Sequence, residues 1–137
     1  MDLRSLEEIA QEALSEHGRF DFSAVQANGY LTLKIRRAIS LDHVKREGVG
    51  RQATISTSGV EAFYLLLDDL YEWRDFDWEK GGQIEIVRLM IRLAMVYLEG
   101  DELKCIRNGF LGRHKSYSLD LGNQSYLFEL VGKVARK

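Results

Sequence analysis

The sequence predicts an α+β fold: a single compact domain over residues 1–137, in which three to four helices pack on a small, mostly antiparallel sheet. Two runs of apolar residues recur at the helical period of 3.6, and an Asn-Gly pair separates two runs with strand character. No internal repeat, low-complexity tract or linker divides the chain. With 137 residues, 45% of them hydrophobic, the chain is long enough to bury one core.

The first apolar run predicts a helix over residues 5–16. Ser5 and Glu8 have the spacing of a capping box, in which two side chains satisfy free backbone amides at the start of a helix. Gly18 follows where a helix can end in a left-handed residue. The apolar stripe of this helix consists of Leu6, Ile9, Ala10, Ala13 and Leu14.

A β-hairpin is predicted next, over residues 20–35, with its turn at Asn28 and Gly29. Asn-Gly favours the positive φ angles that a type I′ turn requires. Apolar and polar residues alternate after the turn, as in a strand with one buried face. The apolar residues of this second arm are Leu31, Leu33 and Ile35.

Residues 38–58 are ambiguous, because 41–47 suits a short helix whereas 52–57 is rich in β-branched residues and suits a strand. Beyond them, a helix is predicted over 58–73. Its first residues, Ser58 and Glu61, repeat the capping-box spacing. Because the run that follows is apolar on all sides, we expect this helix at the centre of the domain.

The rest of the chain is predicted to contain two further helices separated by strands. Residues 83–98 follow the helical period well. Two short strands are expected around 103–106 and 117–121. A last helix is predicted to begin at residue 123 or 125 and to run to residue 137, where basic residues suit the negative end of the helix dipole.

No known catalytic or metal-binding motif is present. The sequence contains no phosphate-binding loop, dinucleotide fingerprint, HExxH helix, EF-hand loop or GxSxG turn. Cys105 is the single cysteine, which excludes a CxxC pair, and the three histidines have no partner at a catalytic spacing. We therefore expect no catalytic residues, metal ligands or cofactor, and a protein that is not an enzyme.

The expected location is the cytoplasm, without membrane contact. The N-terminus lacks the apolar core of a signal peptide, and one cysteine cannot build a disulfide framework. The most apolar stretch, 84–98, is interrupted by Glu85, Arg88 and Arg92, which argues against a membrane span.

An acidic-aromatic segment, residues 68–79, stands out from the even charge of the chain. It holds six acids, one base and four aromatic residues, including both tryptophans. Trp and Tyr dominate binding hot spots, and acids steer basic partners, so this segment predicts a protein-binding surface. The alternative is that the aromatic rings cap the core while the acids face water. The candidate residues are Asp68, Asp69, Tyr71, Glu72, Trp73, Asp75, Phe76, Asp77 and Trp78.

A basic segment, residues 34–51, supports a second hypothesis, nucleic-acid binding. Within it and beyond, residues 41–56 loosely resemble a helix-turn-helix, with the turn at Gly48 and Val49 and with Arg51, Gln52 and Thr54 facing a groove. The candidate residues for phosphate contact are Lys34, Arg36, Arg37, Lys45, Arg46 and Arg51.

The leading functional hypothesis is a non-enzymatic interaction protein, such as an inhibitor, an immunity-type protein, a chaperone-like protein or a small assembly component. The partner would be another protein or a second copy of this chain, because the acidic-aromatic segment of one copy could meet the basic segment of another. Nucleic-acid binding is the alternative.

Overall fold

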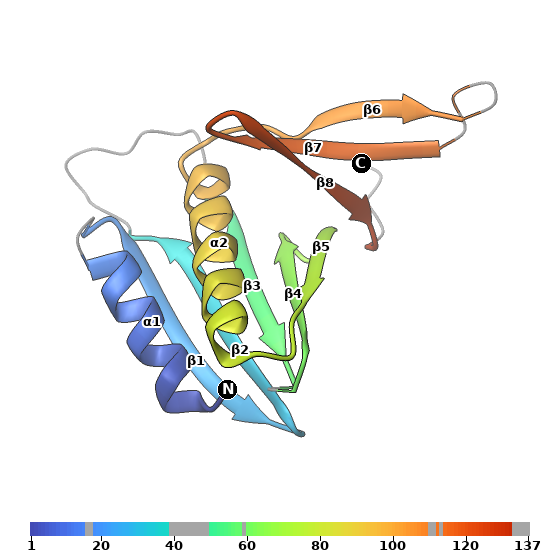
Figure 1. Ribbon diagram of the computed structural model, residues 1–137. Coiled ribbons are helices and arrows are strands. Elements are labelled where there is room, and N and C mark those ends of the chain that lie inside the picture. Colours follow the sequence, from blue (N-terminus) through green and yellow to red (C-terminus); the bar gives the residue numbers. More distant parts are fainter. Residues whose placement is uncertain (16–17, 39–49, 59, 110–111, 113, 133–137) are drawn as a thin grey trace.

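The computed structural model describes residues 1–15, 18–38, 50–58, 60–109, 112 and 114–132, and this part of the chain forms two helices and eight strands (Figure 1). In chain order these are α1 (Leu3–Ser15), β1 (Phe20–Ala27), β2 (Tyr30–Arg37), β3 (Gln52–Thr57), β4 (Ala62–Leu67), β5 (Tyr71–Phe76), α2 (Lys80–Leu98), β6 (Lys104–Asn108), β7 (His114–Leu121) and β8 (Gln124–Leu130). Neither helix is long and apolar enough to cross a membrane.

The strands form one antiparallel sheet with the order β1-β2-β3-β4-β5-β8-β7-β6. The first five strands follow one another as a meander, which we call the main sheet. After α2, the chain returns as β6, β7 and β8, and β8 joins the main sheet at β5 through the pairs Tyr71–Leu130 and Glu72–Glu129. Figure 1 shows that β6–β8 turn away from the main sheet and cross the C-terminal end of α2.

The core lies between the main sheet and the two helices, which cover the same face (Figure 1). Strand residues alternate between this face and the outside, so Leu33, Ile55 and Leu65 lie against Met90 and Ile91 in one buried cluster. Because α1 contributes four buried residues and α2 contributes nine, α2 is the central helix of the domain.

The predicted arrangement of three to four helices on a small sheet is wrong, although the broad α+β character remains. Of the central helix predicted over 58–73, residues 62–67 form β4 and residues 71–73 form the first half of β5 instead. Both faces of β4 are apolar, since half-buried Tyr64 and Leu66 alternate with buried side chains, and this hides the strand period. Asp68 and Asp69 then adopt φ angles of 54° and 56°, which reverse the chain and which no α-helix contains.

The predicted C-terminal helix is wrong for the residues that the structure describes, because 124–130 form β8. Leu127, Leu130 and Val131 have helical spacing, but they are exposed, whereas Phe128 is fully buried. Gly122, at a φ of 61°, makes the turn that pairs β8 with β7. Residues 133–137 lie outside the described part.

The remaining predictions of helices and strands are confirmed where the structure describes them, but the capping box predicted for Ser5 and Glu8 is wrong: α1 begins at Leu3, and the amide of Ser5 donates to the Asp2 carboxylate at 2.8 Å. The first helix is α1, the hairpin about Asn28 and Gly29 is β1–β2, and residues 83–98 lie in α2. The strand alternative for 52–57 is confirmed as β3, and the two strands predicted after α2 correspond to β6 and β7. The short helix over 41–47 lies outside the described residues.

Candidate protein-binding surface

The fold divides the acidic-aromatic segment into three parts: the turn before β5, the strand itself, and the connection to α2. Because side chains alternate along β5, Tyr71 and Trp73 lie on the helix-covered face, opposite Leu67 and Leu65 of β4. Phe76 lies on the outer face. The segment therefore does not act as one surface.

The aromatic rings on the helix-covered face connect the main sheet to β6–β8. The ring of Tyr71 lies 4.8 Å from that of Tyr117, and Trp73 meets Tyr126 edge to face at 5.6 Å. All four side chains are half-buried. For Tyr71 and Trp73, the alternative that the rings cap the core is therefore confirmed, and neither ring is available as a free hot spot.

The turn at Asp68 belongs to a polar network at the C-terminal end of α2. The carboxylate of Asp68 accepts hydrogen bonds from the Tyr97 hydroxyl and, at 2.8 Å, from the amide of Gln52. The Arg51 guanidinium lies 4.5 Å from the centre of the Tyr97 ring and donates to the carbonyls of Tyr97 and Asp101, both at 2.8 Å. Asp68 and Arg51 thus hold the turn, β3 and the helix end together.

We expect the change Tyr97→Phe to reduce stability at neutral pH and to alter its loss in alkali. Burial, followed by the hydrogen bond to Asp68, raises the pKa of Tyr97 above its usual value. The stability from this group is therefore fully present below about pH 10, the pKa of an unfolded tyrosine, and is lost as the pH rises through the folded-state pKa. At pH 7, the variant should lose about 1–3 kcal/mol.

Urea unfolding of the wild type and of Tyr97→Phe at pH 7 and above pH 10 tests this expectation. The difference in unfolding free energy between the two proteins should shrink as the pH rises. A difference that stays constant would show that the Tyr97 proton is not linked to folding.

Three large apolar side chains remain exposed beside β4 and β5, and we call Val60, Phe76 and Trp78 the apolar patch. They are 61%, 69% and 74% exposed. Phe76 pairs across the strands with Ala62 at the end of the β4–β5 ladder. Val60 precedes β4, and Trp78 follows β5, so all three lie at the same end of this hairpin.

Hydrogen bonds from buried Gln83 of α2 fix the two backbone segments that carry the patch. Its side-chain amide donates to the carbonyl of Val60 at 2.6 Å and to that of Asp77 at 3.0 Å. The amide of Asp77 also donates to the carbonyl of Glu61 at 3.0 Å. The patch is therefore supported by a rigid helix and by a strand ladder, which reduces the entropy lost when a partner binds.

A cavity of about 490 Å³ lies beside the patch, at the N-terminal ends of both helices. Val60 and Trp78 form one wall, and Asp2, Ser5 and Lys80 contribute polar groups. Because Val60 and Trp78 are themselves exposed, the cavity is open to solvent on its apolar side.

Two carboxylates lie next to the patch residues in sequence and accept hydrogen bonds from the backbone. Asp75 accepts a hydrogen bond from the amide of Phe76 at 2.8 Å, and Asp77 accepts one from Glu79 at 2.9 Å. Gly82 lies against the Asp77 carboxylate, where an added Cβ would collide with it. This places the negative charge of Asp77 at the positive N-terminal end of α2.

Of the predicted protein-binding residues, Asp75, Phe76, Asp77 and Trp78 lie at this exposed end of the hairpin. The others lie at the turn before β5 or in the first half of β5. Asp69 joins Asp68 at the turn, where its carboxylate accepts a hydrogen bond from Gln52 at 3.2 Å. Glu72 lies 3.9 Å from Arg74 on the outer face. Val60 was not identified from the sequence as a binding residue. It was placed in the helix predicted over 58–73, and a single valine there does not indicate exposure.

The basic segment does not form a helix-turn-helix. Residues 52–57 are strand β3, so the predicted recognition helix does not exist, and Arg51 is bound to the end of α2. Lys34 and Arg36 are exposed on the outer face of β2, and Arg37 is half-buried. Lys45 and Arg46 lie outside the described residues.

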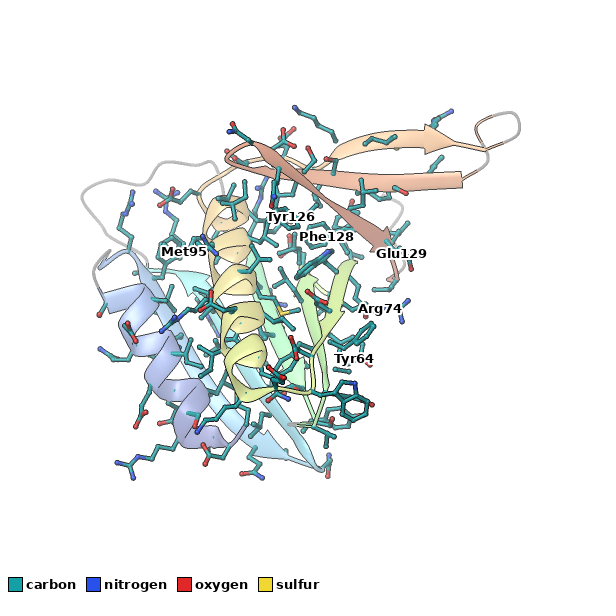
Figure 2. All side chains as sticks on the ribbon, viewed as in Figure 1. Tyr64, Arg74, Met95, Tyr126, Phe128 and Glu129 are labelled. Atoms are coloured by element: carbon teal, nitrogen blue, oxygen red, sulfur yellow. The ribbon has the colours of Figure 1, made fainter. Side chains whose placement is uncertain are left out.

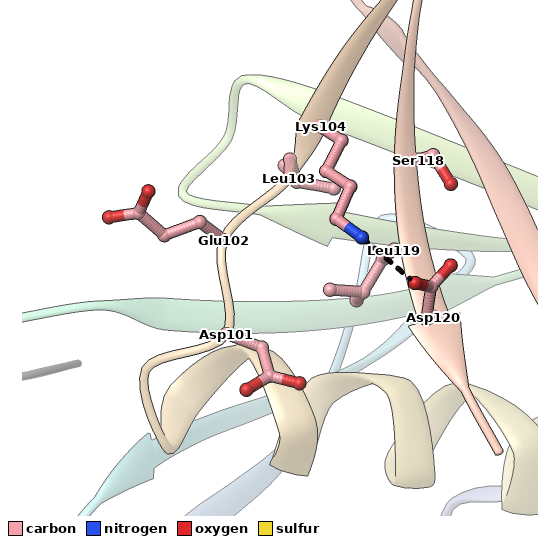
Figure 3. A pocket seen from close by; sticks show the side chains of 7 residues that line it. All are labelled: Asp101, Glu102, Leu103, Lys104, Ser118, Leu119 and Asp120. Carbon is pink, nitrogen blue, oxygen red and sulfur yellow. Dashed lines mark hydrogen bonds and ion pairs between the residues drawn. The ribbon is translucent and has the colours of Figure 1, made fainter.

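A second hollow, of about 420 Å³, lies where the chain leaves α2 and enters β6 (Figure 3). Lys104 spans it to Asp120 at 3.3 Å. A hydrogen bond from Ser125, followed by one from Lys104, lowers the pKa of Asp120. In the described part of the chain, no three His, Cys, Asp or Glu side chains gather as metal ligands.

Comparison of the chain with models of protein families, with curated proteins and with solved structures finds no match. The function therefore has to be inferred from the surface of this molecule.

Proposed function

We propose that the protein is a non-enzymatic protein-binding module that recognises its partner through the apolar patch of Val60, Phe76 and Trp78. The observation that carries this proposal is the exposure of two large aromatic side chains, at 69% and 74%, at one end of a rigid hairpin. Exposed aromatic residues on a folded domain are typical of binding hot spots.

The charges around the patch favour a basic partner. Glu61, Asp75, Asp77 and Glu79 lie within the two segments that carry the patch, against Arg74 and Lys80. A rim of one sign steers an oppositely charged partner and fixes its orientation, while the aromatic residues supply most of the affinity. A segment with an apolar side chain between Lys or Arg residues fits this surface.

Modules of this kind act as inhibitors, immunity-type proteins, chaperone-like proteins or small assembly components. The proposal includes a location in the cytoplasm, where the single exposed thiol of Cys105 would stay reduced. Self-association is a variant of the same proposal, with a second copy as the partner.

Selection from a phage-displayed peptide library tests the proposal. The wild-type protein is the bait, and a Phe76→Ala/Trp78→Ala double variant serves for counter-selection. We expect peptides in which an aromatic or aliphatic residue is flanked by Lys or Arg, and synthetic versions should bind more weakly as salt is raised. If no peptide depends on the patch, the proposal is wrong.

The nucleic-acid alternative is tested by titration with duplex DNA at low salt. Among the candidate residues that the structure describes, Lys34 and Arg36 are exposed cations, whereas Arg51 is engaged in the fold. Binding that falls steeply with salt and is lost in a Lys34→Ala/Arg36→Ala variant would favour it.

A further inference from the structure

Strand β5 has one edge that is paired along its length and one edge that is mostly open. It pairs with β4 from Tyr71 to Phe76, whereas among the described residues its pairing with β8 ends at Glu72. Beyond that point β8 turns toward the C-terminal end of α2, and β5 runs the other way (Figure 1). Although β5 lies between β4 and β8 in the order of strands, the second half of β5 has an unpaired edge on the side of β8.

Backbone hydrogen bonds at the two ends of β5 determine which backbone groups face this open edge. The amide of Asp77 donates to Glu61, on the β4 side, and the carbonyl of Leu70 accepts from Val131, on the β8 side, at 2.7 Å. Backbone groups of successive residues in an antiparallel strand point to alternate sides. The amides and carbonyls of Arg74 and Phe76 thus point to the open edge.

The backbone amides and carbonyls of Arg74 and Phe76 are not all engaged in hydrogen bonds to a neighbouring strand. The amide of Phe76 donates to the side chain of Asp75, its own neighbour. The structure pairs neither the amide nor the carbonyl of Arg74 with another strand in the part of the chain that it describes. Unpaired groups of this kind are a template for an additional strand.

Side chains bridge the two diverging strands on either face as far as Arg74, and beyond it the last residue of β5 is exposed. Trp73 meets Tyr126 on the helix-covered face, and Arg74 lies 3.6 Å from Glu129 on the outer face (Figure 2). Phe76, two residues further along, is exposed and belongs to the apolar patch. The open edge is therefore continuous with the proposed binding surface.

We infer that the partner binds as an extended segment that adds to the open edge of β5, antiparallel like every other pair in the sheet, at Arg74 and Phe76. This inference rests on the proposed function and specifies how the apolar patch is used. Main-chain hydrogen bonds supply part of the affinity in strand addition, and the side chains that alternate along the added strand supply specificity.

The side chains of β5 define the residues that fit on the added strand. Residues directly opposite one another share a face and interact. The position opposite Phe76 takes an apolar side chain, the position opposite Asp75 takes Lys or Arg, and the position opposite Arg74 takes Asp or Glu. We therefore expect the added strand to contain, in chain order, an apolar, a basic and an acidic residue opposite Phe76, Asp75 and Arg74.

An N-methyl scan of the peptide selected with the wild-type protein tests strand addition. Methylation removes a backbone donor and leaves the side chains intact. At positions whose amides face β5, methylation should weaken binding roughly tenfold, because it removes one well-placed hydrogen bond. At the alternate positions, it should have little effect, so that each peptide contains its own control.

Amide exchange of the full chain, followed by NMR, gives an independent measurement. The amide of Arg74 should exchange faster than those of Trp73 and Asp75 in the free protein and should be protected when the peptide is added. Trp73 and Asp75, which face β4, serve as controls because their protection should not change.

The possible results separate this inference from the proposed function. A peptide that needs Trp78 but shows no period-two effect, and leaves Arg74 unprotected, overturns strand addition and leaves the binding module standing. A library that yields no patch-dependent peptide overturns both. Protection of Arg74 that rises with protein concentration alone would show that the edge is occupied by a second copy, contrary to the inference.

Discussion

Replacing Phe128 by alanine is expected to lower the free energy of unfolding by about 3–5 kcal/mol, the usual cost of removing a buried phenylalanine ring. Phe128 is fully buried and belongs to the core cluster, and Figure 2 places it between β8 and the main sheet. Only Tyr71 and Glu72 connect β5 to β8 among the described pairs. Side-chain packing, with Phe128 as the fully buried residue of β8 beside the ring contacts Tyr71–Tyr117 and Trp73–Tyr126, therefore helps to hold β6–β8 on the domain.

Urea unfolding followed by circular dichroism measures this effect, with Leu127→Ala as the matched control. Leu127 is the adjacent residue of the same strand, but it is 52% exposed, so its removal should cost no more than about 0.5 kcal/mol. Losses of similar size in the two variants would contradict the assignment of Phe128 to the core. Loss of cooperativity in Phe128→Ala would show that β6–β8 separate before the main sheet unfolds.

Replacing Trp78 by alanine is expected to weaken binding of the selected peptide roughly 30-fold or more, which corresponds to the loss of about 2 kcal/mol at a hot spot. The indole is 74% exposed and lines the cavity beside Val60, so it can be buried by a partner and contributes little to the core. Stability should stay within about 0.5 kcal/mol of the wild type.

Isothermal titration calorimetry measures the binding, and thermal unfolding verifies the fold. The matched control is Tyr30→Ala, which removes another exposed aromatic residue, 51% exposed, from the β1–β2 hairpin. It should leave peptide binding unchanged. Equal losses in both variants would indicate non-specific apolar binding, and a large loss of stability in Trp78→Ala would place the indole in the fold instead of the binding site.

The candidate site was predictable in part from composition. A segment with six acids and four aromatic residues does contain the exposed Phe76 and Trp78. Composition could not separate these two from Tyr71 and Trp73, because the separation depends on which face of a strand each residue occupies. In a strand, side chains alternate between two faces, so Tyr71 and Trp73 share one face and Phe76 lies on the other. Because a helix was predicted over 58–73, this alternation was not considered.

The amino-acid sequence by itself determined α1, the β1–β2 hairpin and α2, because the signals for these elements are local. The apolar residues from Leu6 to Leu14 recur at the period of an amphipathic helix, Asn28 and Gly29 make their own turn, and the apolar residues of 83–98 recur every 3.6 residues. Each signal lies within the element that it specifies.

Only the tertiary structure decided β4, β5 and β8, and with them the binding surface. Leu66 becomes half-buried through its strand neighbours, Asp68 closes its turn through Gln52 and Tyr97, and Phe128 is buried between parts of the sheet far apart in sequence. The preference of apolar residues for a strand or a helix depends on the surface that they pack against. That surface exists only once the chain has folded, and therefore the exposed end of β5 could not be read from its residues alone.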